Sequence, residues 1–202
     1  MKCIILILAL LRAPLLSNFW LVEQEYIKID KQEIYETIRK GASKESEFCF
    51  YDAQDRAYVY LRPSTGEARQ PSKPPSLLNS ILNFTVSTLQ ELQPDLSSRF
   101  TGHLEETPYA AYQIFSVLPV AEKVFCEQLH KVAIEYEKSS FCWGVWKIIY
   151  GSELPKYVIG FFAPDAKSLE TELKTVKLGI SKEWYRRSEE GRAVLMSHLK
   201  KD

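Results

Sequence analysis

Apolar residues in the first third of the chain recur at spacings that predict a strand, a helix and a hairpin. Residues 25–29 alternate between apolar and polar, as a half-buried strand does. Residues 31–42 carry apolar side chains at helical spacing after an Asp-Lys-Gln-Glu capping box, and Gly41 ends this helix. The segments 47–52 and 57–62 are rich in Phe, Tyr and Val and flank a short turn, so they predict a β-hairpin.

A longer apolar repeat follows a proline-rich segment. Residues 63–76 contain several prolines and serines, and they cannot extend either neighbouring element. Leucine, isoleucine and valine then recur every three or four residues over 76–93, which predicts an amphipathic helix that Pro94 ends. We expect residues 94–108 to form a linker.

The second half repeats the order of the first. Its predicted elements are a strand at 109–117, a helix at 119–137, strands at 141–150 and 157–162, and helices at 166–178 and 182–200. Ser46-Glu-Phe-Cys49 opens the first hairpin, and Ser139-Ser-Phe-Cys142 opens the second. The shared order indicates an internal duplication, with units at 18–106 and 107–202.

The repeated order predicts an α+β fold. A βαββα unit with separated helices favours an antiparallel sheet with the helices on one face, as in ferredoxin-like proteins. Two such units in one chain can pack sheet against sheet and bury the faces that the helices leave uncovered.

Short aromatic motifs in the second half carry a family resemblance. They are the strand motif Trp143-Gly-Val-Trp146, the hairpin Gly151-Ser-Glu-Leu-Pro-Lys-Tyr157 and Trp184. With the helix that follows Asp165, this pattern resembles the dimeric α/β-barrel superfamily and, within it, the NIPSNAP-like proteins. The resemblance implies two tandem ferredoxin-like βαββα units that form an intrachain pseudo-dimeric α/β barrel. It also implies a pocket but assigns no reaction, because the superfamily includes oxygenases, haem-degrading enzymes, isomerases and proteins without known activity.

The first 17 residues have the pattern of a secretory signal peptide. Lys2 precedes a short apolar run, and small residues lie near Ser17. The run is shorter than the roughly 20 apolar residues that span a bilayer. We therefore expect a secreted or periplasmic protein without an integral membrane span, with a buried first strand as the alternative.

Composition and cysteine spacing narrow the function classes. The 202 residues are 46% hydrophobic, and 26 Lys and Arg balance 26 Asp and Glu, so no net field attracts nucleic acid. The four cysteines lack zinc-ligand spacing, and we expect no metal site. In an oxidising compartment Cys49 and Cys142 are the first pair to consider for a disulfide.

No catalytic motif is present in the sequence. It lacks a G-x-S-x-G elbow and the glycine-rich nucleotide-binding loops, so the catalytic residues are unassigned. His130 lies three residues after Glu127 on a predicted helix, an arrangement that a metal or haem site can use. The alternative is a solvated or packing histidine. It is supported by the absence from the sequence pattern of the second ligand pair that metal sites in helix bundles need.

Aromatic residues on adjacent predicted strands are the most suggestive feature. Tyr112, Trp143, Trp146 and Tyr157 form either ordinary core or, together with His130, the lining of a pocket for a flat apolar ligand. Trp143 and Trp146 are an odd number of residues apart and face opposite sides of their strand, so at most one of them lines a given cavity.

Two functional hypotheses remain open. The first is a non-enzymatic exported module that binds a small ligand or a partner and needs no cofactor, either as a monomer with internal pseudo-symmetry or as a homodimer. The second is a small oxygenase or isomerase of the dimeric α/β-barrel type, with haem as an alternative cofactor and His130, Tyr or Trp residues assisting.

Overall fold

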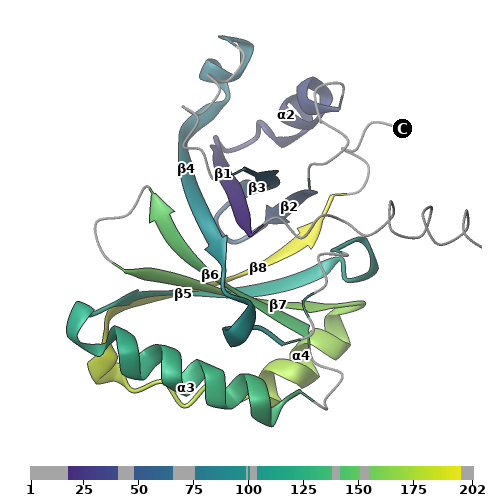
Figure 1. Cartoon of the computed structure of the whole chain (residues 1–202). Helices are drawn as coiled ribbons and strands as arrows, with labels where there is room; N and C mark the ends of the chain where they lie inside the picture. The colour runs from purple at the N-terminus through teal and green to yellow at the C-terminus, as the bar shows by residue number, and fades with distance from the viewer. Residues whose placement is uncertain are drawn as a thin grey trace, which may run out of the picture.

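Eight antiparallel strands close into a barrel in the computed structural model (Figure 1). The structure describes residues 18–40, 48–65, 76–98, 100, 104–137, 142–150 and 155–196. Around the barrel the strands follow the order β1-β3-β2-β8-β5-β7-β6-β4, and β4 pairs back onto β1. The α+β class predicted from the sequence is confirmed.

The elements have the following bounds. The strands are β1 (Phe19–Ile27), β2 (Phe48–Asp52), β3 (Ala57–Ser64), β4 (Leu82–Leu92), β5 (Tyr109–Val117), β6 (Cys142–Tyr150), β7 (Lys156–Ala163) and β8 (Tyr185–Leu195). The helices are α2 (Gln32–Arg39), α3 (Glu122–Glu135) and α4 (Ala166–Thr175). The short 3-10 turns are η1 (Ser76–Ser80), η2 (Pro94–Leu96), η3 (Leu104–Glu106), η4 (Pro119–Ala121) and η5 (Lys182–Trp184).

Both halves of the barrel have the same strand order. The first half runs β4-β1-β3-β2 and the second β8-β5-β7-β6, so each places its fourth strand beside its first and its third beside its second. This is the ferredoxin-like arrangement. The halves meet at two seams, where β2 pairs with β8 and β4 with β6. A shared strand order describes topology and is not itself proof of duplication.

Two predicted helices are strands in the structure. The 76–93 prediction is wrong because this segment forms η1 and then β4, which pairs with both β1 and β6. The 182–200 prediction is wrong because η5 and β8 occupy 182–195, and β8 pairs with β5 and β2. Each half therefore ends on a strand and not on the helix of a βαββα unit. Pairing along both edges outweighs a helical propensity that amounts to tenths of a kcal/mol per residue.

The helices lie outside the barrel. In Figure 1, α3 and α4 cover the outer face of the second half, while α2 lies at the opposite end over the first half. The outer face of β8 has no such cover, and its residues 186–190 are exposed. This leaves part of the sheet surface open beside α4.

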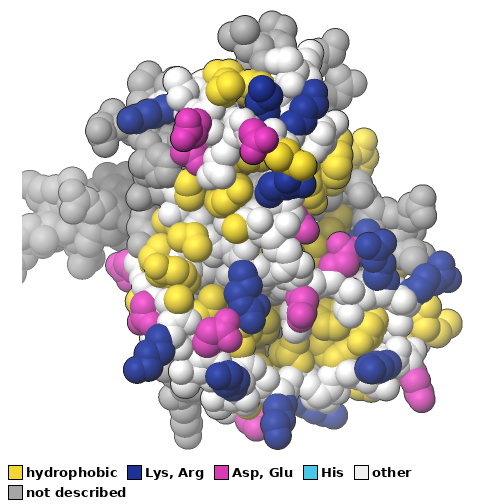
Figure 2. All heavy atoms as spheres, turned by 180° about the vertical axis from the view of Figure 1, so that it is seen from behind, with side chains coloured by type: hydrophobic (Ala, Val, Ile, Leu, Met, Phe, Trp, Pro, Cys, Tyr) yellow, Lys and Arg dark blue, Asp and Glu magenta, His cyan; other side chains and the backbone are white. Residues whose placement is uncertain are grey.

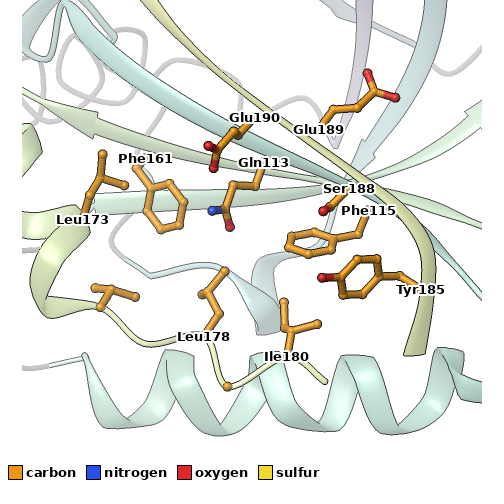
Figure 3. Close-up of a pocket in the computed structure, with 12 residues that line it drawn as sticks. Gln113, Phe115, Phe161, Leu173, Leu178, Ile180, Tyr185, Ser188, Glu189 and Glu190 are labelled. Atoms are coloured by element: carbon orange, nitrogen blue, oxygen red, sulfur yellow. The ribbon is translucent and has the colours of Figure 1, made fainter. Parts of the chain in front are cut away.

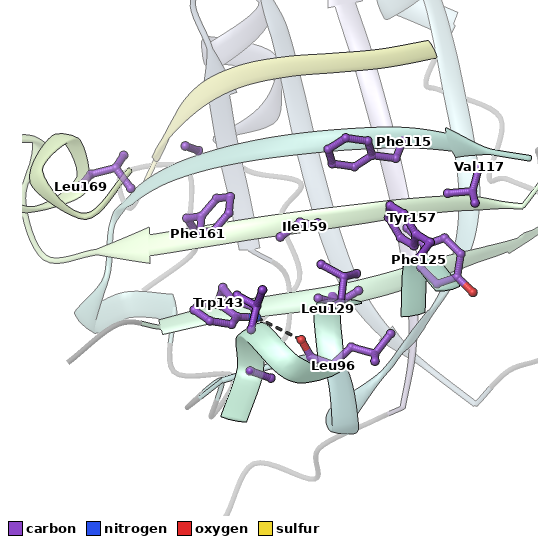
Figure 4. Packing of buried hydrophobic residues seen from close by; sticks show 14 of the residues in the cluster. Leu96, Phe115, Val117, Phe125, Leu129, Trp143, Tyr157, Ile159, Phe161 and Leu169 are labelled. Carbon is purple, nitrogen blue, oxygen red and sulfur yellow. Dashed lines mark hydrogen bonds between the residues drawn. The ribbon is translucent and has the colours of Figure 1, made fainter. Parts of the chain in front are cut away.

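Hydrophobic residues are buried in three places. One cluster lies under α3 and α4, where Phe125 and Leu129 of α3 pack on Tyr157 and Ile159 of β7 (Figure 4). A second fills the inside of the barrel, and a third lies under α2 around Tyr35. The helix–sheet interface and the barrel interior are thus separate cores on opposite faces of one sheet.

The described cysteines form no disulfide. Cys49 is buried in the cluster under α2, whereas Cys142 packs against the barrel interior. Cys49 and Cys142, the first pair to consider for a disulfide, are not bridged, because the two thiols belong to opposite faces of the sheet. The predicted signal peptide at 1–17 lies outside the described residues.

Charges of both signs are interspersed on the surface. Figure 2 shows Lys and Arg next to Asp and Glu, with hydrophobic side chains between them, so neither sign dominates this face. Within the described ranges, no helix is both long and apolar enough to cross a membrane. No three His, Cys, Asp or Glu residues of the same ranges are placed to hold a metal ion.

Candidate functional site: a groove beside the segment 176–181

A groove of about 560 Å³ runs along the outer face of the second half (Figure 3). Its floor is the outer surface of β5, β7 and β8, and its opposite wall is the segment 176–181 that follows α4. Small-molecule sites in proteins typically occupy about 300–1,000 Å³. The groove is therefore large enough for an organic ligand.

Strand alternation gives the groove an aromatic floor. Phe115 of β5, Phe161 of β7 and Tyr185 at the start of β8 all point outward from the barrel. The rings of Phe115 and Tyr185 meet edge to face, with centroids 5.1 Å apart. A flat ligand over Phe115 would contact ring faces and edges, the geometry that aromatic groups prefer.

The wall alternates in the same way. Val176, Leu178, Gly179 and Ile180 line the groove, whereas the side chain of the intervening Lys177 is exposed. Extended backbone places every second side chain on one side, and this segment presents its apolar set to the floor.

Two hydrogen bonds hold the wall against α3. Gln128 Nε2 donates to the Leu178 carbonyl oxygen at 3.0 Å, and the Tyr136 hydroxyl, just beyond α3, donates to the Thr175 carbonyl oxygen at 3.2 Å. Gly179 has φ +64°, and a Cβ there would lie 2.7 Å from Gln128 Nε2. Glycine therefore suits both the left-handed backbone and the close approach to Gln128.

Three polar side chains converge on the groove. Gln113 of β5 is half-buried and points into it, and Ser188 and Glu190 of β8 lie along the exposed side (Figure 3). Nothing in the described part of the chain hydrogen bonds the Gln113 amide or pairs with the Glu190 carboxylate. The neighbouring cation Arg192 is already paired with Glu170, at 2.9 Å. The polar groups of the groove thus include the Gln113 amide, the Ser188 hydroxyl and the uncompensated charge of Glu190.

The five residues predicted as pocket candidates lie in three different places. Tyr112 and Trp146 face the inside of the barrel, where they line a second cavity of about 120 Å³. Trp143 and Tyr157 are buried under α3, and His130 is exposed on α3. None of the five lines the groove.

Contacts of the three residues outside the barrel connect α3, η2 and the sheet. The Trp143 indole N–H donates to the Leu96 carbonyl oxygen at 3.0 Å (Figure 4), and His130 Nδ1 lies 2.8 Å from the Asp95 carbonyl oxygen. The Tyr157 hydroxyl donates to Glu122 Oε1 at 2.8 Å, and Lys147 forms an ion pair with the same oxygen at 2.7 Å. These contacts fix the helix on the sheet.

Glu122 and Tyr157 have shifted pKa values. The hydrogen bond from Lys147 is the main cause that lowers the pKa of the Glu122 carboxyl. Burial raises the pKa of the Tyr157 hydroxyl, and its bonds to Cys126 and Glu122 raise it further. Tyr157 therefore stays neutral well into the alkaline range, as a packed hydrogen-bond donor does.

Tyr112 of β5 forms a hydrogen bond with the fully buried carboxylate of Asp52, which lies beyond the neighbouring strand β8. Its hydroxyl donates to Asp52 Oδ2 at 2.6 Å, while Asp52 Oδ1 accepts from the backbone N–H groups of Gln54 and Asp55. Burial, followed by this bond to Asp52, raises the pKa of the Tyr112 hydroxyl. The pair links the first half of the chain to the second.

The sequence contained a signal for the groove that the helix prediction hid. Ser188 and Glu190 fall in the segment 182–200, and their common face becomes visible only when that segment is a strand. Gln113 stands out as a polar residue in the otherwise apolar run around it. A polar residue on the outer face of a strand that no helix covers is the pattern that indicates such a groove.

Comparison with known proteins identifies the fold. No protein-family model matches the sequence, and no curated protein matches it significantly. Solved structures do match. A candidate monooxygenase from Fusobacterium nucleatum aligns with a TM-score of 0.61 and 13% identity, over 89% of this chain and 92% of that one.

Two further matches agree. An anthrone oxidase-like protein aligns with a TM-score of 0.59 and 10% identity, over 89% of this chain and 92% of that one. A ferredoxin-fold protein from Listeria monocytogenes, described as related to antibiotic biosynthesis monooxygenases, aligns with a TM-score of 0.55 and 10% identity, over 86% and 94% of the two chains. The chain has the dimeric α/β-barrel fold. At such identities the similarity establishes the fold alone.

Proposed function

We propose that the protein binds a small planar organic molecule that carries a hydrogen-bonding or cationic group in the groove. The observation that carries this proposal is an aromatic floor around Phe115 beside a Gln113 amide and a Glu190 carboxylate that have no partner among the described residues. Binding sites for small molecules typically join an apolar surface to a few polar groups that fix orientation.

Binding without chemistry is the function that the lining supports best. The described residues of the groove include no His, Cys or Lys. Ser188 has no base within hydrogen-bond reach in the described part of the chain, so an activated nucleophile is missing there. We therefore propose a ligand-binding module, with one chain closing its own barrel and acting as a monomer.

A small oxygenase or isomerase is the second candidate. Proteins of the same fold that are described as candidate monooxygenases or as oxidase-like favour it. Haem is an alternative cofactor, but the described lining does not favour it. Of the usual haem ligands it supplies Tyr185 alone, and Glu190 would repel the haem carboxylates. Oxygen consumption with bound ligands, and a Soret band on haem addition, test these two versions.

We further propose that residues 1–17 are a signal peptide and that the protein acts outside the cytoplasm. Lys2 and the apolar run after it support this. The shared strand order supports an origin of the two halves by duplication, and the Trp143 and Gly151 motifs support a relation to the NIPSNAP-like proteins. N-terminal sequencing of the mature protein from its native host tests the cleavage.

Ligand-observed NMR with a panel of aromatic fragments tests the groove. We expect tryptamine, which combines a flat ring with an ammonium group, to bind more tightly than indole-3-acetate, since Glu190 attracts the cation and repels the anion. Glu190→Gln should remove most of this preference. Ser188→Trp should fill the groove and abolish binding of both.

The matched control adds the same side chain elsewhere. Lys174 is exposed on α4 and does not line the groove, so Lys174→Trp should leave fragment binding unchanged. If no fragment loses affinity in Ser188→Trp while keeping it in Lys174→Trp, the groove is not a ligand site.

A further inference from the structure

The barrel interior is a second, separate cavity. Its volume is about 120 Å³, and inward-facing aromatic residues from both halves line it, among them Trp20, Phe50, Trp146 and Phe162. An engineered apolar cavity of about 150 Å³ in another protein binds benzene. The space inside this barrel is therefore of the size of one aromatic ring.

One hydrogen-bond donor inside the barrel has no acceptor among the residues that the structure describes. Trp20 is 4% exposed, and its indole Nε1 is buried without a hydrogen-bond partner in the described part of the chain. A buried donor that bonds nothing costs about 1–3 kcal/mol. The indole nitrogen can only donate, so it needs an acceptor from elsewhere.

The other polar side chains of the described lining already have partners. Gln90, paired with Trp20 across β1 and β4, donates to Thr88 Oγ1 at 3.0 Å. Gln24 accepts from the Tyr26 hydroxyl at 3.4 Å, and Tyr112 bonds Asp52. Trp20 is the exception among them, which marks its N–H as the group that a ligand would bond.

The lining is largely apolar and carries no formal charge. An unpaired ion in an apolar interior is costly. No Lys, Arg, Asp or Glu belongs to the described lining. A neutral aromatic molecule with a single acceptor atom meets both conditions, because its ring fills the apolar space and its acceptor meets the indole N–H.

We propose that the barrel interior binds one small, neutral, monocyclic aromatic molecule whose acceptor atom takes the hydrogen bond of the Trp20 indole N–H. This site is independent of the groove, which lies on the opposite face of the sheet. It joins residues of both halves, with Trp20 from β1 and Trp146 from β6.

Benzonitrile and phenylacetylene are a matched pair of probes. They have the same shape, but the nitrile nitrogen accepts a hydrogen bond and the terminal alkyne offers no comparable acceptor. One net hydrogen bond corresponds to an affinity ratio of about threefold to tenfold. We expect benzonitrile to bind the intact protein more tightly by this factor.

Indole resonances report the bond directly. The four tryptophans give four indole N–H signals, and Trp20→Phe identifies the one from Trp20. Benzonitrile should shift this signal strongly and phenylacetylene weakly, and the infrared nitrile band should move to higher frequency. In Trp20→Phe the two probes should bind equally, since the aromatic surface remains and the donor is gone.

Three results with the intact protein would overturn the proposal, and a fourth would come from a groove variant. They are an absence of saturable benzonitrile binding, equal affinities of the two probes for the intact protein, and a Trp20 signal that benzonitrile leaves in place. Ser188→Trp blocks the groove and serves as the control for location. Loss of benzonitrile binding in that variant would assign the probe to the groove and refute an interior site.

Discussion

The hydrogen bond between Tyr112 and Asp52 crosses the weaker seam of the barrel. Within the described residues, the ladder between β2 and β8 has two residue pairs, Phe50 with Leu195 and Tyr51 with Val194, and the Met196 N–H donates one more bond to the Cys49 carbonyl oxygen. Tyr112 of β5 reaches over β8 to Asp52 at the end of β2, and the bond measures 2.6 Å. We therefore predict that Tyr112→Phe destabilises the whole fold and not merely one hairpin.

The structure sets the size of this loss. A hydrogen bond to a charged group contributes about 1.5–3 kcal/mol. Tyr112 is half-buried, and Asp52 keeps its two bonds to backbone N–H groups, so water can replace part of what is lost. We expect a decrease of about 1.5 kcal/mol in the free energy of unfolding. For a protein of this length, that lowers the melting temperature by about 3–6 °C.

Urea denaturation followed by circular dichroism measures the effect. Tyr109→Phe is the matched control, because Tyr109 lies on the same strand and packs outward against the cluster under α3. Its loss of a hydroxyl should change the free energy of unfolding by less than about 0.5 kcal/mol. If Tyr112→Phe and Tyr109→Phe have the same stability, the bond does not hold the seam and the reasoning fails.

Three other predictions concern packing, pH and the groove. Gly191→Ala should cost more than Tyr112→Phe, about 2–3 kcal/mol in chemical denaturation, because its Cβ would press on the Tyr112 ring and lie 2.6 Å from Asp52 Oδ2; a stable Gly191→Ala protein would contradict this. Stability should fall above pH 10, by about 1.4 kcal/mol per pH unit for each buried tyrosine. Burial raises the pKa of these hydroxyls in the folded protein, so the unfolded chain loses its tyrosine protons first and is favoured as the pH rises. A urea midpoint unchanged from pH 8 to 10.5 would rule this out. The tyrosines concerned are Tyr35, Tyr58, Tyr60 and Tyr157, each at most 3% exposed. Gln128→Ala should speed hydrogen exchange of residues 176–181 and weaken groove ligands severalfold with little change in global stability, and unchanged exchange would show that its bond to Leu178 is dispensable.

Local patterns predicted most of the elements correctly. The hairpin strands and the helices α2, α3 and α4 follow from alternation, helical spacing and turn residues, and they agree with the structure to within a few residues. These elements depend on neighbours in sequence. Their local sequence patterns predict the correct element because the tertiary contacts favour the same secondary structure.

The two errors lie where long-range pairing decides the structure. Residues 76–93 carry leucines at helical spacing, yet the Thr85-to-Thr88 stretch is rich in β-branched residues, which favour strands. Residues 182–200 are rich in charged helix formers, with Gly191 as the main sign against a helix. In both cases the strand closes a gap in the barrel, and single-residue preferences contain no information about that gap.

The candidate sites were harder to predict for the same reason. Tyr112 and Trp146 were assigned to a pocket lining because they are aromatic, and they do face the interior cavity. Gln113 is adjacent to Tyr112 and faces the opposite side, toward the groove. Which face of the sheet can hold a ligand depends on where no helix covers it, and the assembled fold determines this.

Closing the barrel within one polypeptide removes a symmetry constraint that applies to homodimers. In a dimer with a two-fold axis, every residue at the shared core occurs twice, so a donor enters the interior as a symmetric pair. Here the inward positions of β1 carry Trp20, Val22 and Gln24, while those of β5 carry Ala110, Tyr112 and Ile114. A barrel that one chain closes can thus have an asymmetric interior, which recognises a molecule lacking symmetry of its own.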